Sequence, residues 1–276
     1  MTLPPVRVYR LQRHTLELTD LTGSSLDAVS LQLPDGVYTT LRTYERRRIV
    51  GLSAHLQRLI DSQAALHVSR SLDLASIRSA LRAVIEREDL PAARLRITVP
   101  DQGEALYISI EPFDAYPDDC YTDGVRCATT RLSRTIPAAK ATDFIAPSRS
   151  LKAASDPGIH ELLLVNTADQ ILEGISSNFF AVLDGILRTA GEEVLAGITR
   201  GVILAEAREV LAVQLIPIRL PDLPQISEAF ITSSSREVMP VIQIDEYVVG
   251  HGQPGSITHT LLQRYRAHLD RTAEEL

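Results

Sequence analysis

The segment Glu111-Pro-Phe-Asp-Ala-Tyr-Pro-Asp-Asp119 divides the chain into two parts, and each part predicts strands as well as helices. Proline and acidic residues crowd this segment, a composition typical of a boundary between domains. The 276 residues of the chain suffice for two modest domains with cores of their own. We therefore predict a mixed fold, α/β or α+β, with a smaller N-terminal domain (residues 1–116), a linker (117–124) and a larger C-terminal domain (125–276).

The N-terminal part alternates between strand and helix signals. Residues 6–18 alternate loosely in polarity, and residues 37–44 are β-branched and aromatic, so both segments predict strands. Ser53 is expected to cap a helix that runs to Leu66, because leucines recur there at helical spacing. The other elements predicted in this part are a turn at 34–36, a hairpin tip at 45–48, a helix at 74–87 and paired strands at 94–99 and 105–110.

The C-terminal part predicts several strands and a closing helix. A continuous apolar run marks a buried strand at residues 161–166, and Asp184-Gly185 marks a hairpin turn. The other elements predicted in this part are strands at 125–129, 179–183, 186–188, 230–231 and 241–244, and helices at 144–154, 199–211 and 256–269.

Composition and charge argue against several classes of function. The net charge of −7 argues against nucleic acid as the main partner. No apolar run approaches the roughly 20 residues that span a bilayer, and the N-terminus lacks the apolar region of a secretory signal. Cys120 and Cys127 are the only cysteines, too few for a disulfide framework. We expect a cytoplasmic protein that binds neither membrane nor nucleic acid and has no metal site.

Lysine is rare in this chain. Only Lys140 and Lys152 occur, and arginine or histidine supplies every other basic side chain. Lys140 follows the small apolar residues of Ile136-Pro-Ala-Ala139, where desolvation would favour the neutral amine that a Schiff base requires. Lys152 lies in a polar helical stretch and is predicted to be exposed. Taken by itself, Lys140 fits a surface lysine better than a catalytic one.

Further motifs suit a phosphorylated pyridine. Glu173 follows an apolar strand, where its carboxylate is able to accept a proton from a pyridinium nitrogen, and Ser176-Ser-Asn178 adds short polar side chains. Gly197-Ile-Thr199 precedes a predicted helix, whose N-terminal N–H groups suit a phosphate. Thr232-Ser-Ser-Ser-Arg-Glu237 offers more hydroxyl groups, and Arg58 offers a bidentate partner for an anion. Each motif alone also fits an ordinary turn, helix cap or solvated arginine.

Six segments, in this order, resemble the class IV aminotransferases, which are enzymes of fold type IV that use pyridoxal 5'-phosphate (PLP). The resemblance covers nearly the whole chain, and the family includes branched-chain and D-amino-acid aminotransferases and 4-amino-4-deoxychorismate lyase. It implies fold type IV, a Schiff-base lysine and a homodimer whose active sites lie at the interface. The six segments are Asp35–Arg42, His55–Leu59, Ile136–Lys140, Leu172–Phe179, Leu195–Arg200 and Thr232–Glu237.

The resemblance also implies roles for individual residues. Lys140 would form the Schiff base and move protons, Glu173 would face the pyridine nitrogen, and Arg58 would bind the phosphate. The implied cofactor-binding residues are Arg58, Lys140, Glu173, Ser177, Asn178, Ile198, Thr199 and Ser234. The implied substrate-binding residues are Tyr38, Arg42, Arg96 and Ser235.

The resemblance favours an aminotransferase that moves an amino group between an amino acid, or an amine, and a 2-oxo acid. The lyase, which releases pyruvate and 4-aminobenzoate, is the alternative, because residues 37–40 and 53–59 also resemble it. A catalytically degenerate PLP-binding protein is a third hypothesis. The chain departs from the family at Phe144 and Ile145, where many relatives carry Asn-Tyr. It also lacks the Arg-x-His pair after Val99 of the best-known D-amino-acid branch, so the residues do not identify the amino donor or its chirality.

Overall fold

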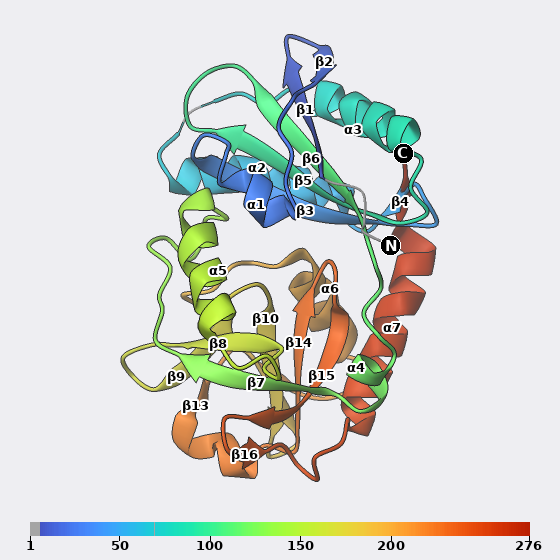
Figure 1. Cartoon of the computed structure of the whole chain (residues 1–276). Helices are drawn as coiled ribbons and strands as arrows, with labels where there is room; N and C mark the ends of the chain where they lie inside the picture. Colours follow the sequence, from blue (N-terminus) through green and yellow to red (C-terminus); the bar gives the residue numbers. More distant parts are fainter. Residues whose placement is uncertain (1–5, 69) are drawn as a thin grey trace. The chain divides into compact units, whose positions relative to one another are not determined.

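The computed structural model describes residues 6–68 and 70–276, which form two compact units (Figure 1). The first unit takes in the described residues up to Ala115, together with 138–150 and 272–276. The second takes in 116–137 and 151–271. The predicted limits differ from this division because 138–150 and 272–276 both pair with strands of the first unit. As limits of independently folding domains, 1–116 and 125–276 stay a prediction.

A seven-stranded antiparallel sheet forms the first unit, in the order β17-β4-β3-β5-β6-β1-β2. The single strand predicted at 6–18 is a hairpin, because Arg13 and His14 turn the chain with φ of 49° and 66°. The strands of this unit are β1 Arg7–Gln12, β2 Thr15–Leu18, β3 Gly36–Tyr44, β4 Arg48–Ile49, β5 Ala93–Pro100, β6 Leu106–Pro112 and β17 Glu274–Glu275. Helices α1 Leu26–Ser30, α2 Leu52–Ala65 and α3 Leu74–Glu88 connect the strands from β2 to β5.

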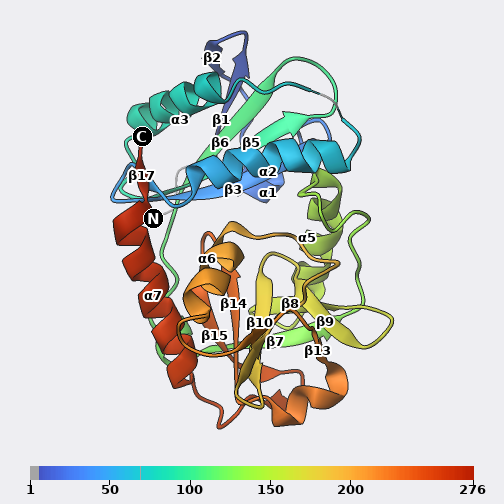
Figure 2. The ribbon, with the colours of Figure 1, turned by 180° about the vertical axis from the view of Figure 1, so that it is seen from behind.

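The two faces of this sheet carry different side chains. Val37 and Leu41 of β3 belong to an apolar core that they share with α2 and α3, which lie across that face (Figure 2). Because side chains alternate along a strand, Tyr38 turns to the opposite face, together with the cross-strand residues Arg94 and Arg96. Helix α1 lies over this polar face, where it contacts β5 and β6. The sheet therefore separates an apolar core from a charged face.

Helix α2 starts earlier than the sequence predicts. Its N-cap is Gly51, whose φ of 62° suits glycine and brings the chain round from β4 into the helix. The prediction of Ser53 as the cap is wrong, because Ser53 lies inside the helix. Its N–H and hydroxyl donate instead to the carboxylate of Glu274 at 3.1 and 3.3 Å.

The second unit contains a ten-stranded sheet, ordered β12-β11-β10-β14-β15-β7-β8-β9-β13, with β16 beside β15. The pairing of Asn178 with Glu173 joins β9 back to β10, so the strands from β10 to β9 close into a ring. An apolar core that includes Leu163, Phe179 and Ile231 fills this unit. Its strands are β7 Val125–Thr130, β8 Glu161–Val165, β9 Gln170–Gly174, β10 Asn178–Leu183, β11 Ile186–Arg188, β12 Val213–Gln214, β13 Ile218–Arg219, β14 Glu228–Ser233, β15 Glu237–Ile244 and β16 Tyr247–Val248.

Helices α5, α6 and α7 agree with the helices predicted at 144–154, 199–211 and 256–269 except at their ends, whereas the short segments α4, η1 and η2 were not predicted. The helix predicted at 199–211 ends at Ala207, whose carbonyl accepts from both Val210 and Leu211 and so tightens the chain into a turn. Lys152 was predicted to be exposed, which is wrong: it is half-buried, and its amine donates to the Ile159 carbonyl. Within the described residues, none of the helices combines the length and apolarity needed to cross a bilayer. The helical segments are α4 Asp119–Thr122, η1 Thr142–Phe144, α5 Ile145–Ala154, α6 Ile198–Ala207, η2 Leu220–Gln225 and α7 Ser256–Thr272.

Candidate active site

Lys140 lies at the open edge of β3, in the first unit. The Tyr38 N–H donates to the Lys140 carbonyl at 2.9 Å, and Ala141 forms a bridge with Val37. The Lys140 N–H donates to Ser62 Oγ of α2 at 3.1 Å. These bonds fix the backbone, and the half-buried side chain extends so that Nζ lies 4.7 Å from the centroid of the Tyr38 ring. The amine therefore contacts a side chain that was predicted to bind substrate.

Arg58 is buried on the other face of the same sheet, with an exposed fraction of 9%. Its Nη2 donates to Thr39 Oγ1 at 2.6 Å and lies 3.2 Å from His55 Nδ1. No described carboxylate pairs with it, and its Nε has no hydrogen-bond partner within the described residues. Burial lowers the pKa of Arg58 to about 10. A buried cation without a counter-ion suits an anionic ligand, and the alternative of a solvated arginine is wrong.

Glu173 is the centre of the predicted site residues in the second unit, with an exposed fraction of 2%. Arg134 Nε donates to its Oε1 at 2.7 Å. Asn178 Nδ2 and the Leu195 N–H each donate to its Oε2 at 3.1 Å. Arg134 is not among the predicted residues, because nothing in the sequence around it points to a partner 39 positions away.

Asn178 connects Glu173 to the start of α6. Its Nδ2 also donates to the Leu195 carbonyl at 2.9 Å, two residues before the helix cap Gly197. A Cβ added at Gly197 would lie 2.0 Å from Asn178 Oδ1, so only glycine fits this approach. No side chain caps α6, its first turn has no acidic residue, and Thr199 is 4% exposed. The N-terminus of α6 therefore has the free N–H groups and positive polarity that an anion requires.

Ser177 has a different neighbourhood from Asn178. Its hydroxyl donates to the buried Glu161 at 3.0 Å, as does the hydroxyl of Ser176 at 2.6 Å. Arg236, which the sequence did not single out, reaches the same carboxylate at 3.4 Å. Ser234 and Ser235 lie beside Arg236 in the turn between β14 and β15. This turn is therefore tied to the loop that follows Glu173.

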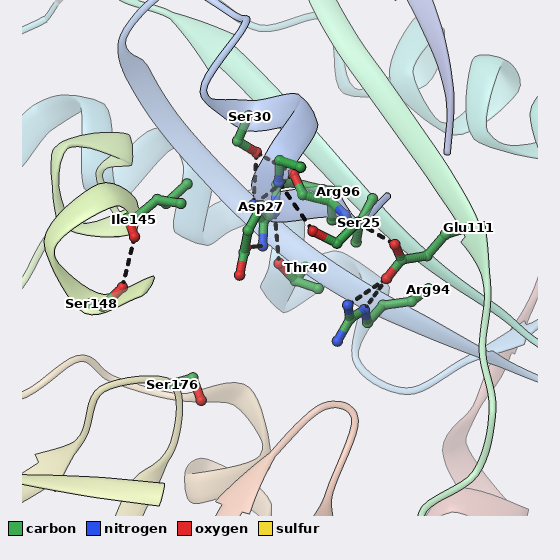
Figure 3. A network of polar contacts seen from close by, with 12 residues as sticks. Ser25, Asp27, Ser30, Thr40, Arg94, Arg96, Glu111, Ile145, Ser148 and Ser176 are labelled. Atoms are coloured by element: carbon green, nitrogen blue, oxygen red, sulfur yellow. Dashed lines mark hydrogen bonds and ion pairs between the residues drawn. The ribbon is translucent and has the colours of Figure 1, made fainter. Parts of the chain in front are cut away.

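The predicted substrate-binding arginines have partners within the first unit. The Arg42 guanidinium lies 4.3 Å from the ring centroids of both Tyr44 and Phe113. Arg96 forms an ion pair with Asp27 at 2.7 Å, part of a polar network under α1 (Figure 3). Neither Asp27 nor its pairing was predicted from the sequence.

The structure thus gathers the predicted residues in two groups, one in each compact unit. Phe144 and Ile145, which replace the Asn-Tyr of many relatives, are buried apolar side chains of the first unit. The first group consists of Tyr38, Arg42, Arg58, Arg96 and Lys140, and the second of Glu173, Ser177, Asn178, Ile198, Thr199, Ser234 and Ser235.

Comparisons with known proteins identify the family of this chain. The model of the family described as amino-transferase class IV matches residues 36–244. A putative branched-chain-amino-acid aminotransferase of Methanocaldococcus jannaschii is 27% identical, over 84% of this chain and 86% of that protein. A D-alanine aminotransferase of Listeria monocytogenes is 25% identical, over 96% of this chain and 97% of that protein.

A solved structure shares the fold of the described residues. The branched-chain amino acid aminotransferase of T.th., crystallised with pyridoxamine 5'-phosphate, superimposes with a TM-score of 0.83 at 19% identity and covers 99% of both chains. The mixed two-part fold predicted as fold type IV is confirmed. Because the family model matches most of the chain, the chain belongs to the class IV aminotransferases.

Proposed function

We propose that this chain is a PLP-dependent aminotransferase in which Lys140 bonds to the cofactor and moves protons at the reacting carbon. The family supplies the activity class, the cofactor and the substrates, which are an amino donor and a 2-oxo acid. The relatives reported above are named as aminotransferases, so the aminodeoxychorismate lyase alternative is not favoured. A homodimer, implied by the family resemblance, and a cytoplasmic location are further parts of the proposal.

The contact of Asn178 with both Glu173 and Leu195 carries the proposal. It ties the motif expected at the pyridine nitrogen to the motif expected at the phosphate, although 17 positions separate Asn178 from Leu195. A molecule with a ring nitrogen at one end and a phosphate at the other could contact both motifs at once. Glu173 would hold the ring nitrogen, and Ile198, Thr199 and Ser234 would hold the phosphate.

The charges within each of the two groups of residues also suit PLP. Arg58 is a buried cation with no described carboxylate beside it, and α6 begins without an acidic residue. Both features favour a phosphate dianion over a neutral ligand. Arg134 holds one oxygen of Glu173 in place, which keeps the carboxylate oriented for a ring N–H.

PLP, when bound, supplies an aldehyde that condenses with amino groups and a pyridine ring that draws electrons from the substrate Cα. The protein supplies the proton transfer. In the proposed reaction, the Lys140 amine would remove the proton from the Cα of the amino donor and pass it to the former aldehyde carbon of the cofactor. When the acceptor is aminated, the same amine would take a proton from that carbon and deliver it to the acceptor Cα. The Tyr38 ring, whose centroid lies 4.7 Å from Nζ, would help to hold the amine in place for this transfer.

The presence of only two lysines makes the proposal directly testable. Borohydride would reduce the imine between PLP and its lysine to a stable secondary amine, and peptide mapping would then locate the pyridoxyl group. We expect it on Lys140, and we expect Lys140→Ala to lower the rate at least about 100-fold, the lower range of what a positioned proton-transfer group contributes. Lys152→Ala is the matched control and should keep the wild-type rate. A pyridoxyl group on Lys152, or a fully active Lys140→Ala variant, would refute the assignment.

Absorbance of the bound cofactor separates the three hypotheses. An aminotransferase converts PLP to its amino form when mixed with a suitable L- or D-amino acid or amine, and a 2-oxo acid reverses the change. A lyase would instead release pyruvate from aminodeoxychorismate without that conversion. A degenerate binding protein would retain the PLP absorbance and do neither. Sedimentation of the PLP-loaded protein tests the dimer, since a monomer at enzyme concentrations that give full activity would exclude it.

A further inference from the structure

Arg96 is already bound by groups of its own unit (Figure 3). Its Nη2 donates to Asp27 Oδ1 at 2.7 Å, and its Nη1 donates to Ser30 Oγ at 2.7 Å and to the Leu26 carbonyl at 3.3 Å. Its Nε lies 3.4 Å from Thr40 Oγ1, and the side chain is 8% exposed. Every nitrogen of this guanidinium therefore has a partner, and a substrate carboxylate would have to displace one.

Asp27 is the outward-facing partner in this network. Its side chain is 47% exposed, and within the described residues only Oδ1 accepts a hydrogen bond. The short helix that carries it is anchored, because the Leu26 N–H donates at 2.9 Å to Glu111, which pairs in turn with Arg94 (Figure 3). The second oxygen of Asp27 is therefore held at a fixed place on the polar face of the sheet.

One aromatic ring connects this ion pair to Lys140. Arg96 Cζ lies 4.5 Å and Lys140 Nζ lies 4.7 Å from the centroid of the Tyr38 ring. The two cations are therefore no farther apart than the sum of these distances. Burial alone would raise the pKa of Asp27, but Arg96, Arg94 and Lys140 bring it below its usual value. A partly exposed carboxylate thus stands in the electrostatic range of the Lys140 amine.

We propose that Asp27 is a specificity-determining residue that makes this enzyme discriminate against dicarboxylic substrates in favour of donors and acceptors without a second carboxylate. The inference rests on the proposed aminotransferase function at Lys140. Asp27 neutralises Arg96 and directs its other oxygen outward, so a second substrate carboxylate meets a like charge instead of a free guanidinium. An aliphatic or cationic side chain meets no such repulsion.

Asp27→Asn tests this role, because asparagine keeps an oxygen for Arg96 and removes only the charge. Glutarate and butyrate, which have no amino or oxo group to react, serve as probes in calorimetric titrations of the PLP-loaded protein. We expect the variant to bind glutarate about tenfold more tightly than the wild type does, with butyrate unchanged. Asp27→Asn combined with Arg96→Gln should lose this gain. Equal glutarate affinities for the wild type and Asp27→Asn would overturn the proposal.

Asp20→Asn is the matched control for charge. Asp20 is an exposed aspartate of the same unit, so its replacement changes the net charge equally and should leave both affinities unaltered. If Asp27→Asn does not melt cooperatively, Asp27→Ser takes its place, because serine also leaves an oxygen near Arg96. A gain in glutarate affinity for Asp20→Asn as large as that for Asp27→Asn would also contradict the proposal.

Kinetics separate this inference from the proposed function. The ratio of kcat/KM for glutamate to that for alanine, measured with both enantiomers, should rise about tenfold in Asp27→Asn. If alanine reacts but this ratio stays constant, the role of Asp27 is wrong and the aminotransferase remains. If a broad panel of amino donors leaves the bound PLP unchanged, the aminotransferase is wrong, while the glutarate titration still decides the role of Asp27.

Discussion

Arg58 has opposite effects on phosphate binding and on the stability of the protein without its cofactor. Its guanidinium is buried, hydrogen-bonded to Thr39 and close to His55, and no described carboxylate balances its charge. The effective penalty for burying an unpaired ion amounts to several kcal/mol even after relaxation. A bound phosphate would offset that penalty, so the side chain destabilises the empty protein and stabilises the loaded one.

Arg58→Met is therefore expected to move two measurements in opposite directions. The apo protein should melt a few degrees higher, because an uncompensated buried charge is gone. PLP should bind about 10- to 100-fold more weakly, because charge-assisted hydrogen bonds contribute about 1.5–3 kcal/mol. Calorimetric melting of the apo protein and fluorescence titration with PLP measure the two effects. Arg58→Lys, which keeps the charge, should show a smaller change in both. A lower apo melting temperature with unchanged PLP affinity would make Arg58 a purely structural residue.

Single residues also mark where prediction from the sequence stops. Lys140 and Glu173 were found through motifs of contiguous residues. Arg134 and Asp27 were missed, because each acquires its meaning from a partner 39 or 69 positions away. For Arg58 the sequence left two alternatives, an anion partner and a solvated arginine, and only the family resemblance favoured the first. The pairing of distant polar side chains follows from tertiary structure, and no local spacing in the sequence records it.

At the scale of elements, the two glycines of α6, Gly197 at its N-cap and Gly201 in its interior, are under different constraints. Gly197 allows the helix end to approach Asn178, since an added Cβ would lie 2.0 Å from Asn178 Oδ1. Its φ of −65° is ordinary, so the constraint is contact and not backbone strain. Gly201 lies in the same helix, and an added Cβ there would meet no atom within 4 Å.

Gly197→Ala is therefore expected to harm the protein, whereas Gly201→Ala is expected to stabilise it. Gly197→Ala should push Asn178 away from Glu173 and Leu195 and weaken PLP binding about tenfold, the equivalent of one charge-assisted hydrogen bond. Gly201→Ala should raise the melting temperature, because alanine favours an exposed helix interior by roughly 0.5–1 kcal/mol over glycine. PLP titration and thermal melting of both variants provide the test. Normal PLP affinity in Gly197→Ala would show that the helix end does not depend on this contact.

The longer elements were predicted well, whereas several short elements, the ends of the elements and the closure of the second sheet were not. Most strands and helices between Gly36 and Leu183 follow local hydrophobic periodicities, which the sequence shows directly. Helix α4 and strand β9, with four and five residues, are too short for such a pattern and were missed. The start of α2 at Gly51, the turn at Arg13 and the end of α6 at Ala207 depend on backbone conformation, which composition constrains weakly. The ring of strands closes through one pairing, Asn178 with Glu173, which no periodicity predicts.

At the scale of the whole molecule, each compact unit contains a histidine that burial keeps neutral. Burial, Arg58 and Lys140 hold the pKa of His55 well below its usual value in the first unit. Burial, followed by Arg236, lowers the pKa of His160 to about 4 in the second. An unfolded histidine titrates near pH 6.5, so below that pH the unfolded chain binds protons that the folded units do not. Both units therefore lose stability as the pH falls.

His160→Gln should make the second unit less sensitive to acid. The histidine is partly exposed, so its contribution, after allowance for solvent screening, amounts to about 1–2 kcal/mol at pH 4. Between pH 7 and pH 4, the melting temperature of the variant should fall less than that of the wild type. Above pH 7 the two curves of melting temperature against pH should run parallel, because His160 is neutral in both the folded and the unfolded state. His251→Gln, which changes an exposed histidine of the same unit, should follow the wild-type curve throughout. If His160→Gln also follows that curve, acid sensitivity comes from other groups, and the neutral histidine of the second unit does not limit stability.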